Sequence, residues 1–228
     1  FLGMVMSQSG VGKSSATELN KQLAGKSAWA STAVAAYEHA IQAGGSPKDI
    51  ETILQLVYLN FTAPRFDEGD LNNLKKMYAP YFANMEQDPN YICSKELQKT
   101  LFNNHYRQQI TSAAQIEALN IATLQSVHSQ LYGCADDFRF VIAGNIDLET
   151  LKPLVEKYIG SLPTSKKVEY AVVDDGVRTA EGKVTNDFRT AMQQPKVSVR
   201  LIYSGAMEDN AKNRLIVDLL SRALDSRY

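Results

Sequence analysis

A glycine-containing segment near the start of the chain has the residue types of a phosphate-binding loop. Residues 7–14 read SQSGVGKS, after an apolar stretch and before a helical pattern. Such a loop wraps backbone N–H groups around phosphate and needs Gly at its first position, where a Cβ would obstruct that path. Ser7 occupies this position. The strand–helix alternation of nucleotide folds is also missing, so we interpret Gly10 to Ser14 as a turn.

The histidines do not have the spacing of a metal site. Zinc needs ligands that converge on one ion, such as two His at i and i+4 on one helix face. His39, His105 and His128 lie far apart in the sequence. Each is therefore predicted to be a surface histidine or a hydrogen-bonded structural one.

The cysteines and the paired acids offer no second route to catalysis. Cys93 and Cys134 are too few for a disulfide framework, lie in no Gly-rich turn, and are expected to be free buried thiols. No Gly-x-Ser-x-Gly nucleophile elbow occurs. The acid pairs at 136–137 and 174–175 are expected to be solvated loop residues without a catalytic role.

Composition narrows the class of protein. The 228 residues carry 24 Lys and Arg against 25 Asp and Glu, a net charge of -1 that would attract neither nucleic acid nor an anionic membrane. No apolar run approaches the roughly 20 residues that span a bilayer. The chain starts at Phe1 and stops at Tyr228 inside a helical pattern, so we expect an excerpt of a longer protein.

The periodicity of the sequence predicts an α+β arrangement. Ser15 with Glu18 three positions on forms a capping box, and Pro80 is expected to kink its helix. The expected elements are a helix at 15–24, one or two strands at 27–42, helices at 46–61, 68–85, 94–102 and 112–132, a buried strand at 138–143, a helix from 147 that ends before 162, a strand at 195–203 and a helix at 210–227.

Loss of periodicity after residue 164 suggests how the chain divides. We expect an α+β domain at 1–165, a linker at 166–194 rich in Asp, Gly, Lys and Thr, and the start of a second unit at 195–228. One strand and one helix cannot bury enough apolar surface to be stable alone. The remainder of that second unit is therefore expected to lie outside this sequence.

Residues 138–163, FRFVIAGNIDLETLKPLVEKYIGSLP, resemble a recurring element of the insulinase/pitrilysin-type zinc metallopeptidases. In that family a buried strand leads through a Gly-Asn turn to a helix that stops at Gly-x-Leu-Pro, before a linker. Residues 195–205, PKVSVRLIYSG, resemble the opening of the next domain. The resemblance implies an antiparallel-type sheet packed by helices, the LuxS/mitochondrial-processing-peptidase-like metallohydrolase fold, followed by the start of a similar domain.

The same resemblance locates the family's zinc motif, His-x-x-Glu-His, at the start of this chain. Aligned on the Gly turn, Ser and Glu-Leu that follow the motif, Phe1 and Val5 stand where the zinc-binding histidines would be. Met4 stands where the catalytic Glu would be, and the third ligand would fall near Pro80 or Tyr81. Neither Phe, Val nor Met binds zinc or moves a proton, so we assign this segment no catalytic, cofactor-binding or metal-binding residue.

The favoured hypothesis is a non-catalytic, chamber-forming and peptide-contacting part of a zinc metallopeptidase. The resemblance implies zinc in the parent's catalytic domain and, as partners, a catalytic half on the same protein or on another subunit, and a peptide substrate. It is compatible with a bacterial periplasmic or cell-envelope location. One alternative is a non-enzymatic scaffold subunit of the same fold; a less favoured one is a nucleotide-binding module that uses the Gly10–Ser14 turn.

Overall fold

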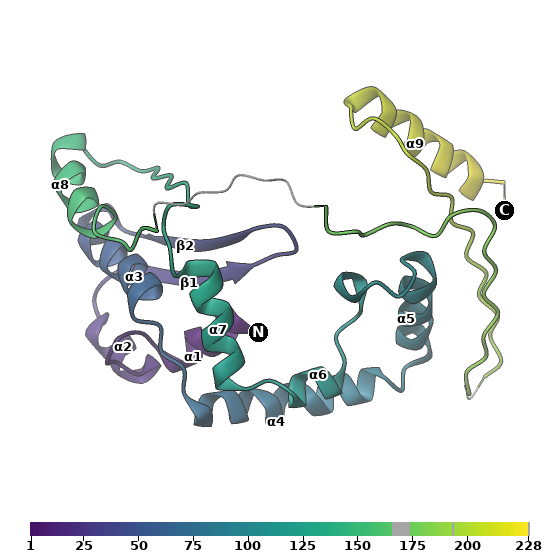
Figure 1. The fold of residues 1–228 in the computed structure, drawn as a ribbon, viewed down its shortest axis with the longest axis horizontal. Coiled ribbons are helices and arrows are strands. Elements are labelled where there is room, and N and C mark those ends of the chain that lie inside the picture. The colour runs from purple at the N-terminus through teal and green to yellow at the C-terminus, as the bar shows by residue number, and fades with distance from the viewer. Residues whose placement is uncertain (166–173, 193, 228) are drawn as a thin grey trace.

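The computed structural model describes residues 1–165, 174–192 and 194–227 (Figure 1). Helices surround one β-hairpin at one end of an elongated molecule, and the chain then runs to a distant terminal helix. The elements are α1 (Leu2–Ser9), α2 (Ala16–Gln22), β1 (Ala28–Val34), β2 (His39–Gly45), η1 (Pro47–Asp49), α3 (Ile50–Thr62), α4 (Glu68–Met85), α5 (Pro89–Leu101), η2 (Tyr106–Gln108), α6 (Ala113–Glu117), α7 (Ile121–Tyr132), α8 (Leu148–Tyr158) and α9 (Ala211–Asp225).

The sheet in the described residues is a single antiparallel hairpin. β1 and β2 pair from Ala28 opposite Gly45 to Val34 opposite His39. Gly44 lies beneath the indole of Trp29, and a Cβ at Gly44 would stand 3.2 Å from that ring. The segment at 27–42 therefore forms two strands rather than one bent strand, and the second extends three residues further than predicted.

The core lies between the hairpin and helices α1, α3, α4 and α7. α1 and α3 pack against β1, and α4 packs against α1. Apolar side chains at helical spacing fill the interior, and each contributes on the order of 1.5–3 kcal/mol through burial. The buried core residues are Leu2, Val5, Met6, Val57, Phe61, Leu71, Leu74, Leu124, Tyr132 and Leu162.

Side-chain caps explain where several helices begin. The Ser15–Glu18 capping box is confirmed at α2, because Ser15 accepts from the Glu18 N–H and the Glu18 carboxylate accepts from the Ser15 N–H. Asn120 caps α7 through the Thr123 N–H and separates it from α6, so the continuous helix predicted at 112–132 is interrupted. Other side-chain caps are Ser112 on α6, Asp67 on α4, Asp88 on α5, Asp147 on α8 and Asn210 on α9.

Two predicted strands were wrong. Residues 138–143 are extended but form no strand, and Val141 is 82% exposed. Residues 195–203 likewise form no strand in their described part, and Val197, Val199 and Tyr203 are largely exposed. A strand requires hydrogen bonds to a neighbour, and no backbone hydrogen bond from either segment to a strand is formed. Among the described residues, no strand lies beside either segment as a pairing partner.

Residues 174–192 contain neither helix nor strand, as expected, while 166–173 lie outside the described residues.

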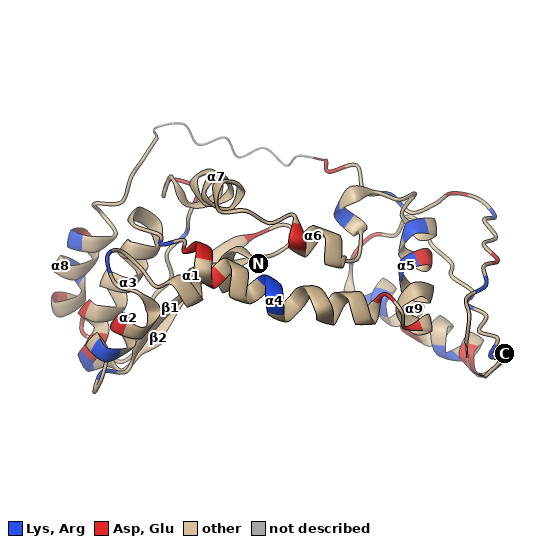
Figure 2. Ribbon diagram, turned by 90° about the horizontal axis from the view of Figure 1, so that it is seen from below, with Lys and Arg blue, Asp and Glu red and all other residues tan. Residues whose placement is uncertain are grey.

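Lys and Arg alternate with Asp and Glu on α5, α8 and α9 (Figure 2). Within the described part of the chain, no helix has both the length and the apolarity to cross a membrane. Cys93 and Cys134 are free and half-buried. The division at 165 and 195 stays a prediction.

Candidate functional site

Helix α1 carries the three positions that the sequence resemblance predicts to correspond to the family's zinc motif. Phe1 is its N-cap, and Met4 and Val5 lie in its first turns. Residues at i, i+3 and i+4 share one side of a helix, so the spacing of the motif is kept. Val5 is fully buried, whereas Phe1 and Met4 are 37% and 38% exposed. The helix thus presents carbon and thioether groups at these positions, and such groups are not zinc ligands.

An aromatic cluster joins α1 to α4 at the place where a third ligand was sought. The ring of Phe1 meets Tyr78 edge-on at 5.8 Å between centroids and Phe82 at 6.5 Å. Pro80 and Tyr81 are exposed on the same helix. Sequence reasoning named those two for the third ligand. It placed Tyr78 and Phe82 on one apolar side of the helix, as their i, i+4 spacing indicates, but did not predict their contact with Phe1.

The described residues contain no group of three or more His, Cys, Asp or Glu able to hold a metal ion. Among the side chains of the Phe1–Tyr78–Phe82 cluster, only the Tyr78 hydroxyl has lone pairs. Zinc needs several ligand atoms that converge on one ion. These residues therefore do not fit zinc.

Each histidine has its own structural surroundings. His128 on α7 is buried, and its Nε2 lies 2.8 Å from the Asn60 backbone oxygen. Burial lowers the pKa of His128, and the hydrogen bond to Asn60 opposes this shift. His39 packs edge-on against Tyr132 and Phe138, at 5.3 and 5.0 Å between ring centroids. His105 caps η2 by accepting from the Arg107 N–H.

The Gly10–Ser14 segment is a tight turn, as predicted, with no cradle for a phosphate. Val11 and Ser14 exchange backbone hydrogen bonds of 3.1 and 3.0 Å, and Gly12 donates to Ala63. Gly10 has φ 87°, a conformation that favours glycine, and Ser7 lies inside α1. The N-terminus of α2 is already occupied by the carboxylate of Glu18. The backbone N–H groups of Gly10, Val11, Gly12, Ser14 and Ser15 are all used in hydrogen bonds within the protein.

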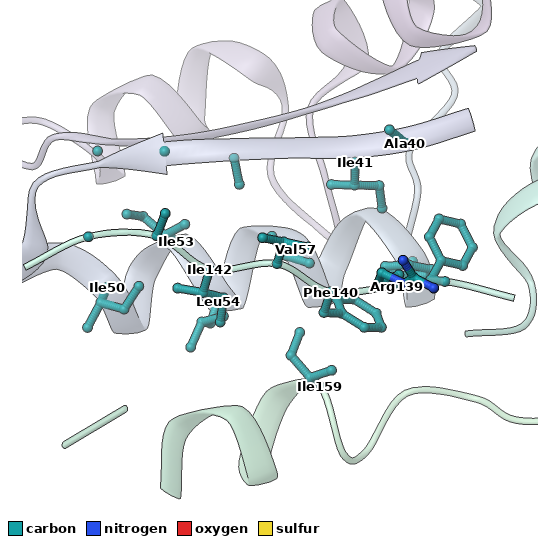
Figure 3. A pocket seen from close by; sticks show the side chains of 18 of the residues that line it. Ala40, Ile41, Ile50, Ile53, Leu54, Val57, Arg139, Phe140, Ile142 and Ile159 are labelled. Atoms are coloured by element: carbon teal, nitrogen blue, oxygen red, sulfur yellow. The ribbon is translucent and has the colours of Figure 1, made fainter. Parts of the chain in front are cut away.

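A groove of about 620 Å³ runs along the outer edge of β2. α3 forms its floor, and the extended residues 138–144 form the opposite wall (Figure 3). The outer edge of β2 makes no ladder, and no backbone N–H of residues 139–143 donates within the described backbone network. The apolar side chains that Figure 3 labels in the groove are Ala40, Ile41, Ile50, Ile53, Leu54, Val57, Phe140, Ile142 and Ile159.

A polar network holds the end of α8 against α3 beside the groove. Tyr158 donates to the Glu51 carboxylate at 2.8 Å, Lys157 donates to the same oxygen at 3.0 Å, and Gln55 donates to the Tyr158 hydroxyl. These interactions lower the pKa of Glu51, the Tyr158 hydrogen bond most strongly. Ile159, the residue after α8, lines the groove beside this network.

Comparison with known proteins assigns the chain to a class. Residues 118–228 match the family described as Peptidase M16 inactive domain. The zinc protease PQQL-like protein of Arabidopsis thaliana is 24% identical over 161 residues, which make up 68% of this chain and 17% of that protein.

Two solved structures share the fold. The periplasmic protease PqqL from Escherichia coli has a TM-score of 0.64 and 22% identity over 73% of this chain and 18% of its own. The ferredoxin protease FusC, in complex with Arabidopsis ferredoxin, has a TM-score of 0.58 and 18% identity over 74% of this chain and 19% of its own.

The mixed helical and hairpin fold and these likenesses define a peptidase-type domain of the inactive kind. The match of residues 118–228 and the similar zinc proteases support a C-terminal, non-catalytic portion of the insulinase/pitrilysin-type (M16) family of zinc metallopeptidases. The resemblance read from residues 138–163 is thereby confirmed. The chain spans 17% of the length of the Arabidopsis relative and 18% of PqqL.

Proposed function

We propose that this chain is a non-catalytic part of a zinc-dependent peptidase that forms a wall of its chamber and contacts the peptide substrate. The observation that carries the proposal is the groove beside the free edge of β2. Its floor is apolar, and within the described part of the chain both of its walls carry backbone groups without ladder partners. A peptide in extended conformation can add to such an edge through main-chain hydrogen bonds, with apolar side chains in the groove.

The catalytic zinc belongs, in this proposal, to another domain or subunit of the parent protein. Zinc bound there would polarise the scissile carbonyl and activate water. The aromatic cluster of Phe1, Tyr78 and Phe82 replaces ligands here. This chain's residues contribute only to holding the peptide.

The proposal also covers the fold type, the domain bounds, the location and the substrate class. The fold is of the LuxS/mitochondrial-processing-peptidase-like type, with a domain at 1–165, a connection at 166–194 and the start of a second domain at 195–228. A periplasmic location is supported by the likeness to the periplasmic protease PqqL, and a protein substrate by the ferredoxin complex of FusC.

The test is peptide binding by the chain and by two variants. A fluorescently labelled, apolar peptide is titrated with the wild-type chain, with Ile142→Asp in the groove and with Val199→Asp outside it. Ile142→Asp is expected to weaken binding about tenfold, because burying an unpaired carboxylate in an apolar groove is unfavourable. Val199→Asp should bind as the wild type does. Equal affinities in all three would remove the groove from the proposal.

Metal analysis tests the other half of the proposal. The purified chain should hold far less than one equivalent of zinc after dialysis and should leave the peptide intact. Stoichiometric zinc with unaided cleavage would contradict a non-catalytic role. If the chain binds neither zinc nor peptide, the scaffold alternative is favoured.

A further inference from the structure

The segment at 174–178 rests on the amino-terminal domain, although it was expected to be part of a linker. Two neighbouring acids show the difference: the Asp175 side chain is 18% exposed and that of Asp174 is 66% exposed. Asp174 pairs with Arg178 inside the segment. Asp175 accepts from the Val177 N–H at 3.0 Å, which orients its second oxygen toward the domain.

Arg107 of η2 forms an ion pair with Asp175. Its Nε lies 3.5 Å from the Asp175 Oδ2, and one of its terminal nitrogens donates to the backbone oxygen of Ala36. The guanidinium carbon lies 5.7 Å from the centroid of the Tyr37 ring. Ala36 and Tyr37 form the turn between β1 and β2. One arginine thus connects η2, the hairpin turn and the segment after the first domain.

Tyr37 and His105 complete the surroundings of Asp175. The interaction of the Tyr37 hydroxyl with the Asp175 carboxylate raises the pKa of Tyr37, and the negative charge of Asp175 adds to the rise. The pKa of Asp175 is lowered, first by the Val177 N–H and then by Tyr37, Arg107 and His105. The charged form of Asp175 is therefore the one that these neighbours favour.

The contacts continue along the chain beyond Asp175. The Ala180 N–H donates to the Leu101 backbone oxygen at 2.7 Å, and the Asn186 amide donates to the Thr100 hydroxyl at 2.7 Å. Both acceptors belong to the last turn of α5. Residues 174–186 are thus attached at the hairpin turn, at η2 and at α5, and Figure 1 shows the chain passing α5 before it reaches α9.

The geometry points to a clasp, made by Asp175, Arg107 and Tyr37, that fixes the path of the chain between the amino-terminal domain and the unit at 195–228. The clasp limits how far that unit moves relative to the hairpin. It stands on these contacts and does not depend on the proposed function; if that function holds, the clasp sets the shape of the chamber wall.

Hydrogen exchange of the complete chain tests the clasp. Asp175→Asn keeps the acceptor for the Val177 N–H and removes the charge, so amides at 176–186, including Ala180, should exchange several-fold faster. Arg107→Gln should have the same effect, and Tyr37→Phe a smaller one. Asp174→Asn is the matched control, because Asp174 contacts only its own segment, and it should leave this exchange unchanged.

Two results would overturn the clasp. One is equal exchange at 176–186 in Asp175→Asn, Asp174→Asn and the wild type. The other is faster exchange spread evenly over α3 and α4 as well, which would give Asp175 a role in overall stability. Because peptide binding is not measured here, failure of the clasp is distinguishable from failure of the proposed function.

Discussion

The imidazole of His128 lies 2.8 Å from the backbone oxygen of Asn60, so a buried histidine on α7 is joined to the middle of α3. A carbonyl oxygen only accepts, so Nε2 carries the proton and donates. The Asn60 side chain in turn donates to the Leu56 oxygen at 2.8 Å. The His128 ring and the Asn60 side chain thus form their hydrogen bonds inside the core. Protonation of His128 would place a charge there, so the contact between α7 and α3 is sensitive to it.

Acid should weaken the fold through His128. Burial lowers its pKa below the ordinary value of 6.5, so between the two pKa values the unfolded chain binds more protons. This contribution to stability is complete above about pH 6.5 and is lost as the pH falls through the folded-state pKa. Urea unfolding followed from pH 7.5 to 5 should show the free energy of unfolding decreasing over that window.

Replacing His128 with Gln separates this effect from general acid unfolding. Glutamine can still donate to Asn60 but does not titrate, so the pH slope between 7.5 and 5 should become shallower than in the wild type. The same slope in both proteins would show that other groups cause the acid sensitivity.

The hydroxyl of Tyr132 should stabilise the hairpin. It lies 2.9 Å from the Ala33 oxygen and 3.3 Å from the Ala40 oxygen, on paired residues of β1 and β2. Tyr132→Phe removes this hydrogen bond and should lower the free energy of unfolding by about 1 kcal/mol. Tyr106→Phe, at an exposed ring, is the control and should be neutral in the same denaturation assay. Equal loss in both variants would contradict the assignment.

The cap at Asn120 explains why α6 and α7 are separate helices. Its side chain accepts from the Thr123 N–H at 2.9 Å, with Asn120 in an extended conformation. Asn120→Ala should destabilise the protein by about 1 kcal/mol, whereas Asn120→Asp should keep most of the cap. Thermal unfolding measures both, and an alanine variant as stable as the aspartate variant would rule out a capping role.

The sequence predicted local structure best where the determinants are local. The capping box at Ser15, the bounds of α4 and the turn at Gly10 follow from residues a few positions apart. The strand predicted at 138–143 failed because a short apolar run favours a buried strand but cannot supply the neighbour to which it pairs.

The candidate site shows the same limit. The resemblance located Phe1, Met4 and Val5, which the structure places on one helix. It could not identify Tyr78 and Phe82 as the contacts of Phe1, because that choice depends on how α4 is rotated against α1. Nor did any sequence pattern distinguish Asp175 from Asp174. The difference is that Arg107 pairs with Asp175, and this depends on where the fold places Arg107.

Leu74 and Met77 of α4 should respond differently to truncation, because one is buried and the other is exposed. Leu74 is fully buried in the core, and Met77, three residues on, is exposed on the same helix. Leu74→Ala removes apolar contacts and leaves a cavity, so it should cost about 2–5 kcal/mol, comparable with much of the stability of a domain. Met77→Ala should change the free energy of unfolding by less than about 0.5 kcal/mol, as surface substitutions usually do. Denaturant unfolding with both variants measures the difference, and similar losses at the two positions would mean that α4 does not pack with Leu74 facing the core.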